Sequence, residues 1–358
     1  MIDNQCFIRC GIPQTVRDSN LELYRIIVMF LIVCHHYVVN SDLMSLMKED
    51  PLSTNSIFYY LFGMWGKTGI NCFVMITGYF MCTSQIILKK FLKLVFQIYF
   101  YNIIITVIFL VCGYGGNKQE MVYWALVPLR AFSVNFVCGF VGLFFLIPYL
   151  NIVIRHIDVK RHIKLCIFGI LVYTVIQYIP NVSINVNYIS WFVILYFIAS
   201  FIRLYPEKIY KNYSSTVWGI FVLTSVLLAM LSVVTVLWFN CSFDSVLSPY
   251  RFVLDSNEIF ALLVSITSFM FFKNLKIKNS RFINMVASTT FGILLIHANS
   301  DTMRQWLWKD MVDCIGHYNV VIYAPIVVVC IYVCCSFIDY LRIISFEKWV
   351  MQKIDKRA

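Results

Sequence analysis

Arg25 and His36 are the residues of this sequence whose types and spacing point most directly to chemistry. Both lie in the first long apolar segment, SNLELYRIIVMFLIVCHHYVV, and eleven positions separate them. At about 100° per residue, that spacing brings both side chains to one face of an α-helix, about 16 Å apart along its axis. A guanidinium can hold an anionic carrier through forked hydrogen bonds, and a neutral imidazole can accept a proton near pH 7. The pair therefore predicts a site that binds an anion at one depth and transfers protons at another.

Ionisable side chains inside a membrane span are costly, so a functional role is the default interpretation of Arg25 and His36. Two structural alternatives stay open, because Arg25 could snorkel near a helix end and His36 could hydrogen-bond to a neighbouring helix. Glu22 lies three residues before Arg25, so it could orient the guanidinium, or it could form a capping box with Ser19. His35 is adjacent to His36 but about 100° around the helix, so we expect it to face elsewhere and to be structural.

The composition indicates a multi-pass membrane protein. Of the 358 residues, 60% are hydrophobic and 13% are charged, and the mean hydropathy is +0.78, which lies outside the range of soluble globular domains. We predict an all-α polytopic fold of about ten transmembrane helices, forming one domain over residues 1–358. Residues 1–18 would be a cytoplasmic segment and residues 344–358 a cytoplasmic tail. The predicted spans are 21–39, 57–82, 91–112, 135–154, 163–179, 186–204, 216–239, 255–272, 284–300 and 321–343.

Two regions complicate the prediction of ten spans. Gly66-Lys67-Thr68-Gly69 interrupts the span 57–82, so its first half is expected to lie in the membrane interface or to form a broken helix. Residues 121–132 are a second candidate for an interfacial segment.

The distribution of basic residues predicts the orientation. If the N-terminus is cytoplasmic, 21 of the 29 Lys and Arg residues fall on the cytoplasmic side, seven fall on the opposite side, and Arg25 lies within a span. The positive-inside rule then places both termini in the cytoplasm. The same rule explains the net charge of +11 without a nucleic acid partner.

Cysteine usage gives no sign of a disulfide framework or a metal site. The chain has 13 cysteines, an odd number, and most lie within the predicted spans, where they behave as small apolar residues. Cys6 and Cys10 are too isolated to form a convincing metal pair. We therefore expect no bound metal ion and no permanently bound cofactor.

Four sequence elements, in this order, resemble the acyltransferase-3 family of integral membrane O-acyltransferases. The first is an arginine followed, after ten residues, by a histidine, with an acidic residue just before: here Glu22, Arg25 and His36. The second is an apolar stretch that ends in Ser-Gly-Phe or Ser-Gly-Tyr in the family. Here it runs over residues 71–80 and contains Thr77-Gly78-Tyr79, with threonine at the usual serine.

The third and fourth elements lie further along the chain. The family often has arginines and a nearby proline at the start of the third helix, where this sequence has Lys89-Lys90-Phe91-Leu92-Lys93 and no proline. The family's closing phrase, usually Phe-Gly-Ile-Tyr-Leu-x-His, resembles Thr290-Phe291-Gly292-Ile293-Leu294-Leu295-Ile296-His297. The resemblance covers nearly the whole chain, as a single-domain form of the family.

The resemblance implies an O-acyltransferase, most simply an O-acetyltransferase, in the inner (plasma) membrane. Acyl-CoA in the cytoplasm would be the donor, and the acceptor would be a sugar hydroxyl of a glycan or lipid-linked saccharide of the cell envelope. Besides these two substrates, membrane lipids are the expected partners. A function from another class stays open, namely a polytopic glycan flippase or exporter that carries out no chemistry.

The resemblance also implies roles for individual residues. His36 would be the general base, and Arg25 would bind the acyl-CoA. The candidate supporting residues are Glu22, Asn71 and His297. Asn71 and His297 have interhelical hydrogen bonding as their alternative role. The further candidate acyl-CoA-binding residues are Lys89, Lys90 and Lys93. Their alternative is to retain the loop on the cytoplasmic side.

Overall fold

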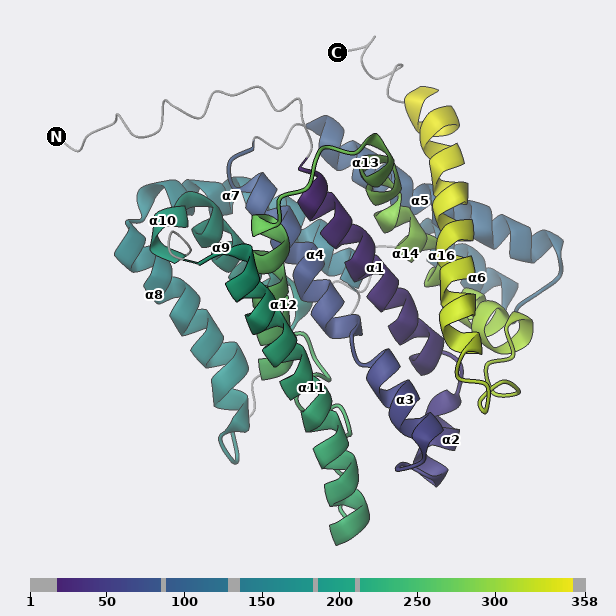
Figure 1. Ribbon diagram of the computed structural model, residues 1–358. Helices are drawn as coiled ribbons and strands as arrows, with labels where there is room; N and C mark the ends of the chain where they lie inside the picture. The colour runs from purple at the N-terminus through teal and green to yellow at the C-terminus, as the bar shows by residue number, and fades with distance from the viewer. Residues whose placement is uncertain (1–17, 85–87, 128–135, 183–185, 210–212, 350–358) are drawn as a thin grey trace.

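The computed structural model describes residues 18–84, 88–127, 136–182, 186–209 and 213–349, and all regular structure in these ranges is helical. The N-terminal half contains α1 (Ser19–Val39), α2 (Leu43–Glu49), α3 (Thr54–Gly63), α4 (Gly66–Met81), α5 (Leu88–Val111), α6 (Lys118–Leu126), α7 (Phe136–His156) and α8 (Val159–Ile170). The C-terminal half contains α9 (Tyr188–Leu204), α10 (Pro206–Ile209), α11 (Ser215–Phe243), α12 (Ile259–Asn274), α13 (Arg281–Ser288), α14 (Thr290–His297), α15 (Asp301–Arg304) and α16 (Tyr323–Arg342). Figure 1 shows these helices packed as one bundle.

The structure supports a multi-pass membrane protein but gives fewer long spans than the predicted ten. Within the described residues, five helical segments are long and apolar enough to cross a membrane: α1, the part of α5 from Lys90, α7, α11, and residues 323–347. A sixth span results if Arg281–His297 and Asp301–Met311, which meet at a bend of 93°, are counted together. The apolar helices α9 and α12 are shorter. Each predicted span contains a helix, but the number ten is not confirmed.

The predicted interruption in the second span is present, because α3 ends at Gly63 and α4 begins at Gly66. Three glycines in this region face α1 at very short range. An added Cβ would lie 2.8 Å from Val38 at Gly63, 2.3 Å from the His35 ring at Gly66, and 2.7 Å from Ile32 at Gly69. Small residues allow helices to approach closely in membranes, so these glycines explain why the broken pair packs tightly on α1.

The helix ends that carry the predicted cytoplasmic residues lie together at one end of the bundle. In Figure 1, α1 begins and α16 ends at the same end, beside α13. The Ser19 hydroxyl donates to the Asn284 side chain (3.0 Å) and accepts from the Ser280 amide (2.9 Å), which joins α1 to α13. Ser19 therefore does not form the predicted capping box with Glu22. The N-cap residue is Asp18, whose side chain makes no capping hydrogen bond.

Parts of the predicted organisation fall outside the described residues. These parts are residues 1–17 with Cys6 and Cys10, residues 350–358 of the predicted tail, and residues 128–132 of the predicted interfacial segment. The first half of that interfacial segment overlaps α6.

The orientation remains a prediction that labelling can test. Val182 and Lys164 lie in exposed positions of regions predicted to be on opposite sides of the membrane. A membrane-impermeant thiol reagent added to intact cells should label Val182→Cys above the background of the native cysteines and should not label Lys164→Cys. Both should be labelled after the membrane is permeabilised. Labelling of Lys164→Cys in intact cells would reverse the predicted orientation.

Candidate active site

A cavity of about 730 Å³ lies at the end of α1 that carries His36. Side chains from α1, α4, α5, α6, α9 and the region around α14 and α15 form its walls. Its polar and aromatic lining includes His35, His36, Lys67, Asn102, Asn117, Glu120, Trp124, Tyr188, Asn299, Asp301 and Arg304. Pockets with a few convergent polar groups are the usual binding sites of proteins, so this cavity is the candidate active site.

His36 is hydrogen-bonded to His297 within this region. The Nδ1 atom of His36, in the last turn of α1, lies 2.8 Å from Nε2 of His297, the last residue of α14. The Nδ1 atom of His297 lies 2.6 Å from the Ile293 carbonyl oxygen, which can only accept a hydrogen bond. Nδ1 of His297 is therefore the protonated nitrogen, and in a neutral ring its Nε2 is an acceptor.

The hydrogen-bond network assigns one tautomer to each ring of the pair. Because Nε2 of His297 accepts, Nδ1 of His36 must carry the proton that is donated to it. The Nε2 atom of a neutral His36 then has a free lone pair on the opposite edge of the ring. Since His36 lines the cavity, a neutral His36 held in this tautomer by His297 is the candidate base of the site.

His35 differs in part from the expectation that it would face elsewhere. Its Nδ1 atom lies 2.6 Å from the Gly63 carbonyl oxygen, and its ring packs on Gly66. These contacts agree with a structural role. However, His35 also lines the same cavity as His36, together with Gly66 and Lys67 at the start of α4.

Two cations, Lys67 and Arg304, also line the cavity, and no local sequence pattern predicts either of them as a site residue. The Lys67 amine donates to the Tyr188 hydroxyl (2.9 Å) and lies 3.4 Å from the Asp255 carboxylate. Arg304 donates to the Asp301 carboxylate at 2.8 Å. Both cations can favour negative charge that develops on a substrate. In the described part of the chain, no group of three or more His, Cys, Asp or Glu side chains is arranged to hold a metal ion.

Arg25 does not line the cavity with His36. Its guanidinium pairs with Glu22 at 3.4 Å and lies 6.0 Å from the centre of the Phe73 ring on α4. The predicted alignment on one helix face is therefore not enough to bring Arg25 and His36 into one chamber, because α4 packs against α1 between their levels. Glu22 pairs with Arg25, and that it orients the guanidinium for a ligand stays a prediction.

Asn71 acts as a buried link between helices. Its side-chain amide donates to the Ser256 carbonyl oxygen at 2.6 Å, and its side-chain oxygen accepts from the Trp191 indole at 2.9 Å. Asn71 thus joins α4 to α9 and to the segment before α12. These bonds are the interhelical hydrogen bonding that the sequence offered as the alternative role of Asn71, and its role as a supporting residue of the site stays a prediction.

The three lysines at the start of α5 have different environments. Lys93 forms an ion pair with Glu347, which also pairs with Arg342 at 2.6 Å. Arg342 pairs in turn with the buried Asp339 at 2.7 Å. Lys90 is exposed, and the side chain of Lys89 lies outside the described residues. Lys93 is therefore part of an ion network with the end of α16, an environment that the sequence could not reveal.

The same ion network positions α14, the helix that ends in His297. Asp339 accepts hydrogen bonds from Tyr101 of α5 (2.7 Å) and from Arg342, and it lies directly against Gly292 of α14. An added Cβ at Gly292 would be 2.1 Å from Cγ of Asp339. Only a glycine permits this approach, so the Phe-Gly-Ile phrase of the sequence sets the position of α14 and, through it, of His297.

The fold and the site together define a multi-pass membrane protein with a hydrogen-bonded histidine pair, of which His297 is buried and His36 partly exposed, on a polar cavity. A family model described as an acyltransferase domain matches residues 18–339, which is most of the chain. The protein therefore belongs to the acyltransferase-3 family, and the resemblance carried by the four sequence elements is confirmed. No curated protein and no solved structure matches the chain.

The contact between Gly292 and Asp339 predicts the effect of a single added methyl group. Gly292→Ala should lower the free energy of unfolding by about 1–3 kcal/mol, because the buried carboxylate and its partners have to move. It should also reduce acyl transfer, because α14 carries His297. Thermal unfolding of purified protein in detergent measures the first effect.

Gly219→Ala on α11 is the matched control. The added Cβ would be 3.4 Å from the Phe271 ring, which is close to an ordinary contact. The substitution should therefore leave the midpoint of thermal unfolding unchanged or raise it. Equal midpoints for Gly292→Ala and Gly219→Ala would contradict the assigned role of Gly292.

Proposed function

We propose that this protein is an O-acyltransferase of the inner (plasma) membrane. It moves an acyl group, acetyl in the simplest case, from cytoplasmic acyl-CoA to a sugar hydroxyl of a cell-surface or lipid-linked polysaccharide. Membership of the acyltransferase-3 family supports acyl transfer in general. The observation that carries the proposal is the His36–His297 pair, which leaves Nε2 of His36 as a base on the wall of the cavity.

In the proposed reaction, the acceptor hydroxyl attacks the thioester carbonyl of the donor while Nε2 of His36 takes the hydroxyl proton. The new carbon–oxygen bond gives a tetrahedral oxyanion, and the positive charges of Lys67 and Arg304 favour it electrostatically. When the intermediate collapses, the carbon–sulfur bond breaks and the thiolate takes the proton from His36. The products are the sugar ester and free CoA thiol, and His36 returns to its neutral form.

The lining of the cavity supports a sugar as acceptor. The side-chain amide of Asn299 donates to the side-chain oxygen of Asn102 at 3.0 Å, and both residues line the cavity. Glu120 and Trp124 line it too, and the indole nitrogen of Trp124 lies 3.4 Å from the Glu120 carboxylate. Amides and carboxylates can exchange hydrogen bonds with hydroxyl groups, and an aromatic ring offers an apolar face. A glycan exporter without chemistry would not require a fixed base in this cavity.

The catalytic prediction is that His36→Ala lowers the rate of acyl transfer by about 10²–10⁴-fold, the usual cost of losing a general base. Release of free CoA thiol by purified protein, with acceptor saccharide present, measures the rate, and membrane abundance is matched between variants. His35→Ala should lose less than about tenfold, because the His35 ring bonds to the Gly63 carbonyl and packs on Gly66, which are contacts of a structural kind. Transfer by His36→Ala at the native rate would refute this mechanism.

His297 supplies a second control for the same mechanism. His297→Leu removes the acceptor that fixes the tautomer of His36, whereas His297→Gln keeps a side-chain oxygen that can accept from Nδ1. Activity should therefore fall strongly in the leucine variant and recover in part in the glutamine variant. A leucine variant as active as the glutamine variant would show that His297 only fills space.

The donor prediction concerns Arg25. Arg25→Lys keeps the charge but loses the forked hydrogen bonds, so it should weaken use of acyl-CoA by about 1–3 kcal/mol. Initial rates over a range of acyl-CoA concentrations separate an effect on the donor from an effect on the acceptor. Normal donor kinetics in the lysine variant would reduce Arg25 to an anchor that pairs with Glu22 and packs on Phe73.

A further inference from the structure

A cluster of cations surrounds Tyr79 at the end of the bundle where α1 begins, and it takes no part in the His36 cavity. Arg203, near the end of α9, donates to the Tyr79 hydroxyl at 2.9 Å, and its guanidinium lies 4.7 Å from the centre of that ring. The amine of Lys273, at the end of α12, lies 5.9 Å from the centre of the same ring. Two half-buried cations therefore share one aromatic side chain.

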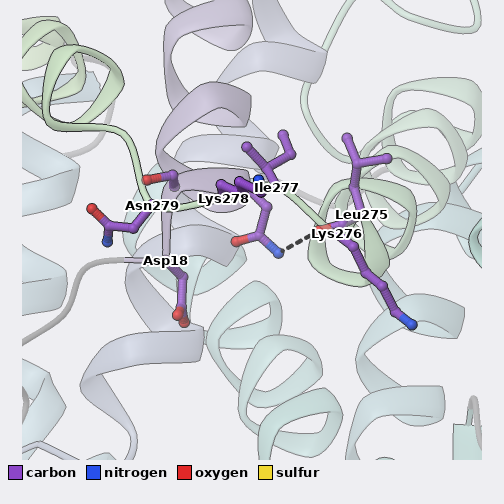
Figure 2. Close-up of a pocket in the computed structure, with 8 residues that line it drawn as sticks. Asp18, Leu275, Lys276, Ile277, Lys278 and Asn279 are labelled. Carbon is purple, nitrogen blue, oxygen red and sulfur yellow. Dashed lines mark hydrogen bonds between the residues drawn. The ribbon is translucent and has the colours of Figure 1, made fainter.

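A second cavity, of about 470 Å³, lies next to this cluster and is shown in Figure 2. Residues 18–20 at the start of α1 and residues 275–279 after α12 line it, including the exposed Lys276 and Lys278. The side-chain amide of Asn20 donates to the carbonyl oxygens of Lys273 (2.9 Å) and Leu275 (3.2 Å). These two hydrogen bonds place the backbone of Lys273 at the edge of the cavity.

The described wall of this cavity carries two lysines, Lys276 and Lys278, and one acidic residue, Asp18. Arg203 makes no ion pair in the part of the chain that the structure covers. Cations held close together repel one another, and a bound polyanion relieves that repulsion. Retention of loops in the cytoplasm explains exposed lysines such as Lys276, but it does not require two cations to be half-buried on one ring.

The position of the cluster limits which anion it can serve. Asp18 and His36 are about 27 Å apart along α1, at about 1.5 Å per residue. Arg25 lies between them, about 10 Å from Asp18. A ligand that contributes to the chemistry at His36 while its charges lie at the cluster must therefore be long and must carry its charges at one end. Acyl-CoA has this form, because a long neutral arm separates its thioester from its phosphates.

We propose that Arg203, Lys273, Lys276 and Lys278 bind the phosphate groups of the acyl-CoA donor beside Tyr79. This inference rests on the proposed function, because it takes acyl-CoA as the donor. It moves the main phosphate site from the start of α5, where Lys93 is already paired with Glu347, to the surface between α1, α9 and α12. Arg203 supplies a planar fork for phosphate oxygens, and the three lysines supply compact charges.

Binding of CoA and of pantetheine, which lacks the phosphates, to purified full-length protein in detergent tests this site by isothermal titration calorimetry. The double variant Arg203→Gln/Lys273→Gln should weaken CoA binding by about tenfold or more, and its pantetheine binding should stay unchanged. The exposed pair Lys276→Gln/Lys278→Gln should weaken CoA binding by several-fold without a risk to folding. Lys160→Gln/Lys164→Gln, which also removes two exposed positive charges but on α8, should have little effect.

Three outcomes would overturn the proposed phosphate site. The first is unchanged CoA affinity in the Lys276→Gln/Lys278→Gln variant. The second is an equal loss of CoA and pantetheine binding in the Arg203→Gln/Lys273→Gln variant, and the third is native protein that binds CoA no better than pantetheine. Thermal unfolding of each variant identifies any that fail to fold. If the Arg203→Gln/Lys273→Gln variant does not fold, CoA binding by the Lys276→Gln/Lys278→Gln variant decides whether the site is correct. The proposed function is tested separately by acyl transfer with native protein. If CoA binding depends on the cluster but native protein transfers no acyl group, the phosphate site is supported and the proposed acyltransferase activity is refuted.

Discussion

The hydrogen bond between His36 and His297 is the interaction on which the candidate site depends. It joins α1 to α14, and it directs the protons of both rings because His297 is already committed to the Ile293 carbonyl. A polar atom without a partner is costly in an apolar bundle, and this bond together with the Ile293 carbonyl gives partners to three of the four ring nitrogens of the pair. The fixed base is therefore a consequence of satisfying polar groups where water is scarce.

The rest of the bundle holds the two helices that carry this pair. On one side, Gly63, Gly66 and Gly69 let α3 and α4 approach α1, which places Lys67 beside the histidines. On the other side, Gly292 lets α14 rest on Asp339 of α16. Asp339 is held by Arg342, whose partner Glu347 also pairs with Lys93. Ion pairs thus reach from the exposed Lys93 on α5, through the buried Glu347, Arg342 and Asp339, to the helix that carries His297. The pairing replaces the hydration that the three buried groups lose.

The features that the sequence predicted are local ones. Helical periodicity and hydropathy located the apolar segments, and the rarity of ionisable groups in such segments selected His36 and Arg25, while the family resemblance added His297. The features that it missed depend on partners far along the chain. No local pattern joins Lys93 to Glu347 or places Arg25 on Phe73, and none brings Lys67 and Arg304 to one cavity. The predicted number of ten spans is not confirmed, since hydropathy does not distinguish a long straight helix from shorter apolar helices such as α9 and α12, or from a pair that meets at a 93° bend.

The arrangement of charge along α1 connects the two ends of the molecule. The cations around Tyr79 are concentrated where the helix begins, whereas the histidine pair and the polar cavity lie where it ends. A small anion could bind only at the cationic end, and a neutral acyl compound would gain no electrostatic attraction from the cations there. A donor with a charged head and a distant thioester can use both, so binding energy gained at the head can hold the reactive carbonyl near His36. In the proposed reaction the acyl group then crosses most of the apolar layer, while the bulk of the glycan stays on its own side.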